Sequence, residues 1–183
     1  MPYAIELFLD EVTDGEVRRV WRQLAAATDV DYLLRNNVRP HVALVVFDLV
    51  KEGVSCWREK IGENAPPLRL KPAGIGSFDG GVIFVRIEKE DGLTALNREC
   101  VDFCESIGAT VSPYYTPERW EPHCTLAQSL PANVLMKGEQ MALQELRECP
   151  WTVDAIGMVA FPPTTTIDEK KWANETERPR MLP

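Results

Sequence analysis

Histidine is scarce in this chain, which has only two among 183 residues. Long apolar runs are missing as well: none approaches the roughly 20 residues that a membrane-spanning helix needs. The first residues also lack the basic and then apolar pattern of a secretory signal. We therefore expect a cytoplasmic protein, with the nucleus as the alternative, and no membrane partner.

Basic residues are outnumbered, because 20 Lys and Arg stand against 28 Asp and Glu, for a formal net charge of -8. A protein that binds long nucleic acids through their phosphates needs an extended basic surface. The charge therefore argues against an extended nucleic-acid-binding surface. It leaves a small nucleotide or the end of an RNA as a substrate.

Cysteines are few and irregularly spaced, and their number, five, is odd. Without an export signal, reduced thiols are the default. Cys100 and Cys104 lie one helical turn apart, but no second pair accompanies them, so buried packing is favoured over metal binding. We expect no metal and no cofactor. The length and the 45% apolar content predict one domain over residues 1–183. We expect this domain to be a monomer.

The chain contains two half-units, at about residues 3–47 and 82–127, with the same order of strand, turn, helix, loop and second strand. In the first, these are a strand over Tyr3–Leu9, a turn at Thr13–Gly15, a helix over Glu16–Ala27 and a strand over His41–Phe47. In the second, they are a strand over Val82–Ile87, a turn at Asp91 and Gly92, a helix over Leu93–Ile107 and a strand over His123–Ala127. Such a repeat predicts two lobes related by a pseudo-twofold axis, with a ligand between them.

The remaining segments add a short helix near 55–61, an extended piece at 68–71, a helix at 135–148, a strand at 152–161 and a polar tail from about 164 to 183. No glycine-rich phosphate loop follows a strand, so a doubly wound nucleotide fold is disfavoured. We predict an α+β fold of two lobes, in which mainly antiparallel sheets line a central cleft and the helices lie outside.

Both histidines occupy the same local motif, Pro40-His41-Val42-Ala43-Leu44 and Pro122-His123-Cys124-Thr125-Leu126. Proline is tolerated at the first position of a strand, and side chains alternate between the faces of a strand. His41 and Ala43 therefore share one face, as do His123 and Thr125. Two imidazoles can serve as the acid and base that split a phosphodiester near neutral pH.

The paired motifs resemble those of the 2H phosphoesterase superfamily, which includes 2'-5' RNA ligase-like proteins and cyclic phosphodiesterases. The resemblance implies a bilobal α+β fold, no metal requirement, and action on 2',3'-cyclic or 2'-5' phosphodiesters. By the same resemblance, His41 and His123 match the catalytic histidines and Thr125 matches the second-motif hydroxyl. Ala43 departs from the pattern, because the family has Thr or Ser at that position.

Four further residues complete the predicted site. Arg39 is a candidate phosphate contact that could replace the missing first-motif hydroxyl, and aromatic side chains at a cleft can stack on bases. The aromatic candidates are Tyr115, Trp120 and Phe47.

These features predict a metal-independent phosphodiesterase that hydrolyses 2',3'-cyclic phosphates or related 2'-5' phosphodiesters of nucleotides or RNA ends. The assignment of acid and base to the two histidines stays open at this point. Three alternatives remain: an RNA 2'-5' ligase acting in the same cleft, a nucleotide-binding module of weak activity, for which Ala43 is the argument, and a metal hydrolase. The last is disfavoured by the presence of only two histidines.

Overall fold

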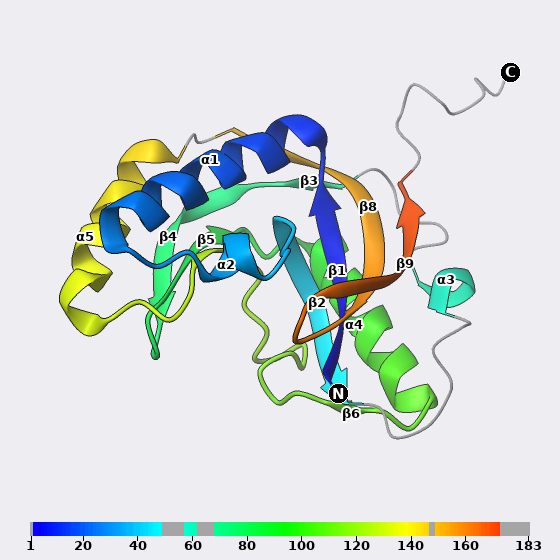
Figure 1. Ribbon diagram of the computed structural model, residues 1–183. Helices are drawn as coiled ribbons and strands as arrows, with labels where there is room; N and C mark the ends of the chain where they lie inside the picture. The colour runs from blue at the N-terminus through cyan, green and yellow to red at the C-terminus, as the bar shows by residue number, and fades with distance from the viewer. Residues whose placement is uncertain (1, 49–56, 62–67, 147–148, 173–183) are drawn as a thin grey trace, which may run out of the picture.

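A computed structural model describes residues 2–48, 57–61, 68–146 and 149–172, which form two antiparallel sheets with helices on the outside (Figure 1). The larger sheet has the strand order β3-β8-β1-β2-β6, and β9 pairs with β8. The smaller sheet has the order β4-β5-β7. The predicted α+β fold with mainly antiparallel sheets is confirmed.

The strands of the larger sheet are β1 (Pro2–Leu9), β2 (His41–Asp48), β3 (Arg69–Leu70), β6 (Thr110–Val111), β8 (Trp151–Ala160) and β9 (Thr165–Lys171). Those of the smaller sheet are β4 (Pro72–Phe78), β5 (Val82–Ile87) and β7 (His123–Ala127). The helices are α1 (Glu11–Thr28), α2 (Tyr32–Arg35), α3 (Trp57–Lys60), α4 (Asp91–Ser106) and α5 (Ala132–Glu145). No helix in these ranges is both long and apolar enough to cross a membrane.

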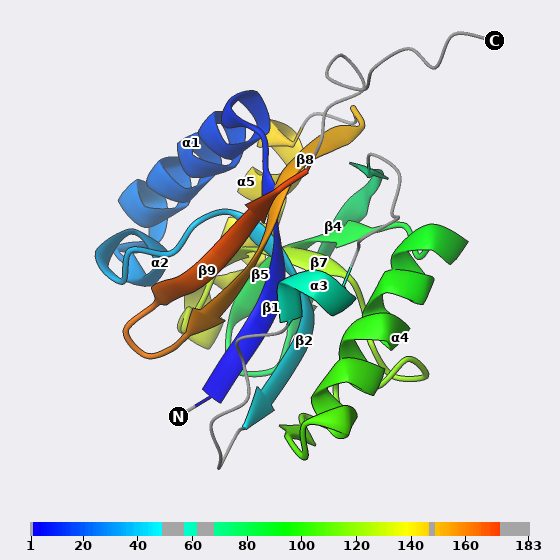
Figure 2. The same cartoon turned by 90° about the vertical axis from the view of Figure 1, so that its right-hand side faces the viewer.

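Each long helix of a half-unit packs on a motif strand of the other half-unit. Helix α1 follows β1 in the chain and contacts β7 as well as β1, whereas α4 follows β5 and contacts β2 and β6. Figure 2 shows α1 and α4 on opposite sides of the molecule with strands between them. Buried apolar residues from both sheets join in one large cluster, so the two halves share a core.

Helix starts differ from the prediction, because both predicted turns lie inside helices. Asp10 has extended backbone and its carboxylate accepts a hydrogen bond from the amide of Thr13 at 2.9 Å, so α1 begins at Glu11. Gly15 is helical, with open space around the position of a side chain. Helix α4 likewise begins at Asp91. An exposed glycine near the start of each helix, Gly15 in α1 and Gly92 in α4, therefore does not interrupt the helix.

Three strands, β4, β6 and β9, and one short helix, α2, were not predicted. Strand β4 contains a proline and two glycines, and a Cβ at Gly76 would lie 2.7 Å from the Phe84 ring. Strand β9 is polar and occupies the first part of the segment that we expected to be a tail. Helix α2 has a single turn. Such segments lack an apolar periodicity, since their positions are decided by pairing with other elements.

Candidate active site

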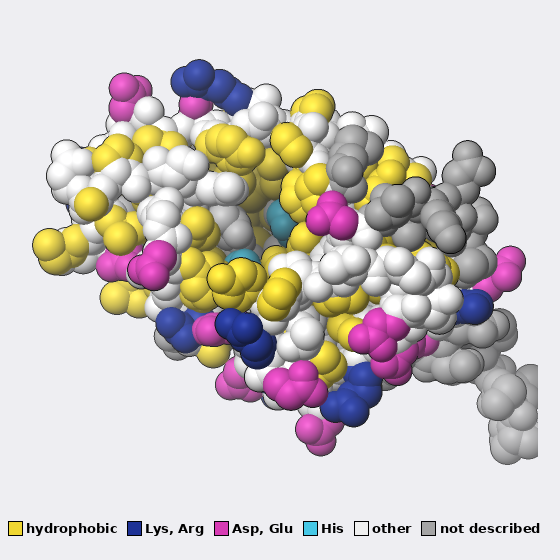
Figure 3. All heavy atoms as spheres, turned by 90° about the horizontal axis from the view of Figure 1, so that it is seen from below, with side chains coloured by type: hydrophobic (Ala, Val, Ile, Leu, Met, Phe, Trp, Pro, Cys, Tyr) yellow, Lys and Arg dark blue, Asp and Glu magenta, His cyan; other side chains and the backbone are white. Residues whose placement is uncertain are grey.

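A pocket of about 360 Å³ lies where β2 and β7 meet, at the junction of the two sheets. Figure 3 shows both histidines inside a hollow that is surrounded largely by apolar side chains. The larger sheet contributes Ala4, Glu6, His41, Ala43 and Val46; β7 and the residue after it contribute His123, Thr125 and Gln128; the remaining lining residues are Tyr32, Leu33, Asn36, Val38, Tyr115 and Phe161 to Thr164.

The two imidazoles are held in the same way. The Nδ1 atom of His41 lies 2.7 Å from the carbonyl oxygen of Arg39, and the Nδ1 atom of His123 lies 2.7 Å from the carbonyl oxygen of Glu121. A carbonyl can only accept, so each Nδ1 carries the proton. In both rings Nε2 is thus the nitrogen left to take or give a proton in the pocket.

A β-bulge lies at the last residue of each motif and changes which later residue faces the pocket. In the pairing of β1 with β2, Ile5 faces Val45 and Glu6 faces Ala43, so Leu44 is the extra residue. The pairing of β5 with β7 skips Leu126 in the same way. The leucine three residues after each histidine therefore marks a bulge, and the next pocket-facing residues are Val46 and Gln128.

Side chains from other elements bind the backbone at these bulges. The indole N–H of Trp120 donates to the carbonyl of Ala43 at 3.0 Å, and that of Trp21 donates to the carbonyl of Thr125 at 2.9 Å. The Asn97 amide donates to the carbonyl of Leu44 at 2.7 Å. These bonds fix the strand segments that carry the pocket-facing residues.

Trp21 on α1 and Asn97 on α4 stand at equivalent positions of the two helices. The buried positions that show the common spacing are Val17, Val20, Trp21 and Leu24 on α1, and Leu93, Leu96, Asn97 and Cys100 on α4. Each helix thus holds the motif strand of the opposite half-unit, as a pseudo-twofold arrangement requires.

The surroundings of His41 are polar and acidic. The Oε1 atom of Glu6 lies 3.4 Å from its Nε2 atom. Burial raises the pKa of Glu6 above its ordinary value, although the charges of His41 and Arg39 oppose the shift. Glu6 therefore places a buried carboxyl group beside the pocket-facing nitrogen of His41.

The surroundings of His123 are aromatic. Its ring lies 5.0 Å from the ring of Phe78, edge to face, and 5.0 Å from the ring of Phe84. Burial lowers the pKa of His123, and the charge of His41 lowers it further, while the hydrogen bond to the Glu121 carbonyl opposes the shift. These surroundings favour the neutral form of His123.

The thiol of Cys124 is fully buried on β7, the strand that contacts β2. Burial raises the pKa of this thiol to about 12. A neutral, buried thiol is not a nucleophile, so Cys124 contributes to core packing rather than to chemistry.

Among the residues predicted for the site, His41, Ala43, Tyr115, His123 and Thr125 line the pocket. Burial raises the pKa of the Tyr115 phenol to about 12, and the charge of Glu6 adds to the shift. Tyr115 therefore offers the pocket a neutral O–H group.

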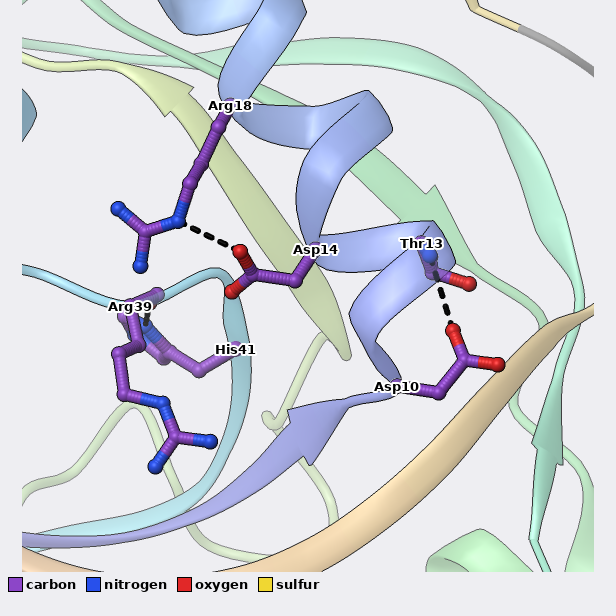
Figure 4. Close-up of polar contacts among 6 residues, drawn as sticks. All are labelled: Asp10, Thr13, Asp14, Arg18, Arg39 and His41. Atoms are coloured by element: carbon purple, nitrogen blue, oxygen red, sulfur yellow. Dashed lines mark hydrogen bonds and ion pairs between the residues drawn. The ribbon is translucent and has the colours of Figure 1, made fainter.

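Phe47, Trp120 and Arg39 do not line the pocket, contrary to the prediction. Alternation from His41 places Phe47 on the pocket face, but the bulge turns it into the core, where it is 1% exposed. Trp120 is 2% exposed and binds the backbone of Ala43. The Arg39 guanidinium lies over the Phe8 ring and 2.6 Å from the Glu169 carboxylate, and Figure 4 shows it directed away from the His41 ring.

The sequence analysis missed the acid at the pocket and most of its rim. Glu6 carried a signal, because it is the only charged residue within the apolar strand β1. No comparable signal in the sequence marked the other pocket residues: Tyr32 in α2, Asn36 just after it, Gln128, and the segment from Phe161 to Thr164. The described ranges contain no group of three or more His, Cys, Asp or Glu side chains placed to hold a metal ion.

Two antiparallel sheets that each bring one histidine motif to a shared pocket define a 2H phosphoesterase fold. A family model of the 2'-5' RNA ligase superfamily matches residues 12–162, and the chain belongs to this family. Its members are phosphodiesterases and ligase-like enzymes. No curated protein matches the chain.

Several solved structures resemble this one. A crystal structure described as a phosphoesterase has a TM-score of 0.60 and 15% identity, over 94% of this chain and 98% of that chain. Kluyveromyces marxianus Usb1 with uridine monophosphate has a TM-score of 0.45 and 13% identity, over 91% and 96%. The MHV ns2 PDE domain has a TM-score of 0.44 and 18% identity, over 70% and 83%. At these identities the first structure supports the fold alone.

Proposed function

We propose that the protein is a metal-independent phosphodiesterase that hydrolyses 2',3'-cyclic phosphates, or related 2'-5' phosphodiesters, of small nucleotides or RNA ends. The observation that carries this proposal is that one pocket holds both imidazoles, each with its Nδ1 bonded to a backbone carbonyl and its Nε2 left for proton transfer. The volume of about 360 Å³ lies in the range of small-molecule sites.

The different surroundings of the two histidines support an assignment of roles. His123, whose pKa is lowered, is the general base that removes a proton from the attacking water. His41 is the general acid. As the water oxygen bonds to phosphorus and the bond from phosphorus to the ribose oxygen breaks, Nε2 of His41 gives its proton to that leaving oxygen.

The remaining pocket residues suit the rest of such a substrate. Thr125 shares the pocket-facing side of β7 with His123 and can donate its hydroxyl proton to a phosphate oxygen. At the rim, Tyr32 offers a ring for stacking, while the amides of Asn36 and Gln128 can hydrogen-bond a base edge. A single nucleotide at the end of a strand fits these contacts without an extended basic surface.

The proposal is tested by incubating the purified protein, with EDTA present, with 2',3'-cyclic nucleotides, ADP-ribose cyclic phosphate and 2'-5' linked dinucleotides. We expect ring opening or cleavage that survives the chelator. A protein that leaves all three substrates intact, or that loses its activity in EDTA, would contradict the proposal.

The same cleft is the basis of a second candidate, RNA 2'-5' ligation, because Thr125 and both histidines can serve the reverse reaction. Oligonucleotides with cyclic-phosphate and 5'-hydroxyl ends separate the two activities, since a ligase joins them and a hydrolase only opens the ring. A nucleotide-binding module is the third candidate, which Ala43 favours. It would bind a 3'-phosphate nucleotide tightly in calorimetry without turnover.

A further inference from the structure

Glu6 has an unusual position for a carboxyl group at a site that binds phosphate. It is 6% exposed and lies on the pocket face of β1. Its neighbours in the sheet are Ala43 on β2 and Gly157 on β8, which have the two smallest side chains. The carboxyl group therefore has room above the first motif, beside Nε2 of His41.

The two motifs differ at the position that carries a hydroxyl group in the second. Thr125 follows His123 by two residues and faces the pocket, whereas Ala43 at the corresponding position has only a methyl group. The adjacent strand supplies a polar group in this place, because Glu6 pairs directly with Ala43. Each side of the pocket thus has one oxygen-bearing side chain next to its histidine.

An ionised Glu6 would repel a bound phosphate, so its protonation state decides its role. The groups around it are His41 and Arg39, whose charges favour the ionised form, and the hydroxyl of Tyr115 and thiol of Cys124, both neutral at pH 7. Burial favours the protonated form. A phosphate beside this pair adds negative charge and shifts the balance further toward proton uptake.

We propose that Glu6 is a phosphate-contacting residue, which takes up a proton as phosphate binds and donates it in a hydrogen bond to a phosphate oxygen, in place of the hydroxyl that Ala43 lacks. The bound phosphate then takes over from Glu6 the stabilisation of a protonated His41. This inference rests on the proposed function, because it requires a phosphate group in the pocket.

The test is calorimetry of inorganic phosphate and adenosine 3'-monophosphate binding at pH 7, in buffers that differ in ionisation enthalpy. E6Q keeps an N–H donor but has no titratable group, whereas E6A has neither. We expect wild type to take up more protons per bound phosphate than E6Q. We expect E6A to bind roughly ten- to a hundredfold more weakly than wild type, as the loss of a hydrogen bond to a charged group predicts.

Tighter phosphate binding by the Glu6 variants would contradict the inference. If Glu6 stays ionised and only repels anions, E6A and E6Q both bind phosphate more tightly than wild type, and proton uptake is unchanged in E6Q; this would overturn the inference. T125V is the matched variant on the other side of the pocket, and we expect it to weaken binding without changing proton uptake.

A measurement on the wild-type protein makes the test independent of how the variants fold. The carboxyl carbon shift of Glu6, followed by NMR at pH 7, will report the protonated form in saturating phosphate if the inference is right. An ionised Glu6 in the phosphate complex of an enzyme that opens cyclic phosphates would overturn this inference alone. A wild-type protein that binds neither phosphate probe and opens no cyclic phosphate would overturn the proposed function as well.

Discussion

The bond between Trp120 and the bulge of the first motif makes a quantitative prediction. In W120F the buried Ala43 carbonyl loses the indole N–H that lies 3.0 Å away. A buried acceptor without a partner costs about 1 to 3 kcal/mol, and the smaller ring adds on the order of 1 kcal/mol for the void. We therefore expect W120F to lose about 2 to 4 kcal/mol of unfolding free energy.

Trp57 provides the matched control, because it is 1% exposed and its indole nitrogen is buried with no hydrogen-bond partner among the described residues. W57F therefore changes packing without removing such a bond. In a chain of this length 1 kcal/mol corresponds to about 2 to 4 °C in Tm. We expect thermal unfolding of W120F roughly 5 to 15 °C below wild type, and W57F markedly closer to it.

Activity provides the second readout of this prediction. The hydrogen bond from Trp120 holds β2 at its bulge. Loss of this bond in W120F therefore displaces His41 and lowers kcat, while W57F keeps the wild-type rate. Equal losses of Tm and equal kcat values in W120F and W57F would refute the argument that this hydrogen bond holds the motif strand.

Other predictions concern the pocket itself. H41A and H123A are each expected to lower the turnover of a cyclic nucleotide by about a hundred- to ten-thousandfold; wild-type rates in both would rule out the acid-base mechanism. T125V is expected to lower kcat/KM roughly ten- to a hundredfold by removing a donor to the phosphate, and an unchanged value would remove the threonine from the site. Phe78 is 37% exposed, so F78A admits water to His123 without opening the core. Because burial lowers the pKa of His123 and the base must be neutral, F78A raises that pKa and moves the acid limb of the profile of kcat/KM against pH to higher pH. L143A, at an exposed position of α5, is the control; a limb that stays in place in F78A would show that the aromatic rings do not set this pKa.

The bounds of several strands could be predicted from the local pattern of apolar and polar residues. The second strand of each half-unit begins at its histidine, and Val82–Ile87 and His123–Ala127 have their predicted bounds. Apolar runs bounded by proline or polar residues carry that information within a few positions. The first residues of the helices were harder to predict, because a capping side chain such as Asp10 outweighs a glycine near the start of the helix.

The identity of the pocket residues beyond the histidines depended on pairing between strands. A single extra residue at Leu44 reverses the faces that follow it, so Val46 reaches the pocket and Phe47 the core. The order of side chains along β2 does not predict this reversal of faces, because a bulge exists only in the pairing of β2 with β1.

The amino-acid sequence by itself determined the two repeated motifs, their strands, and hence the class of chemistry, since these depend on residue types and on spacing along the chain. Only the tertiary structure decided that Glu6 lies beside one imidazole and Phe78 and Phe84 beside the other. The reason is physical: the proton affinity of a side chain depends on the charges and the burial around it, and those come from elements that are distant in the sequence.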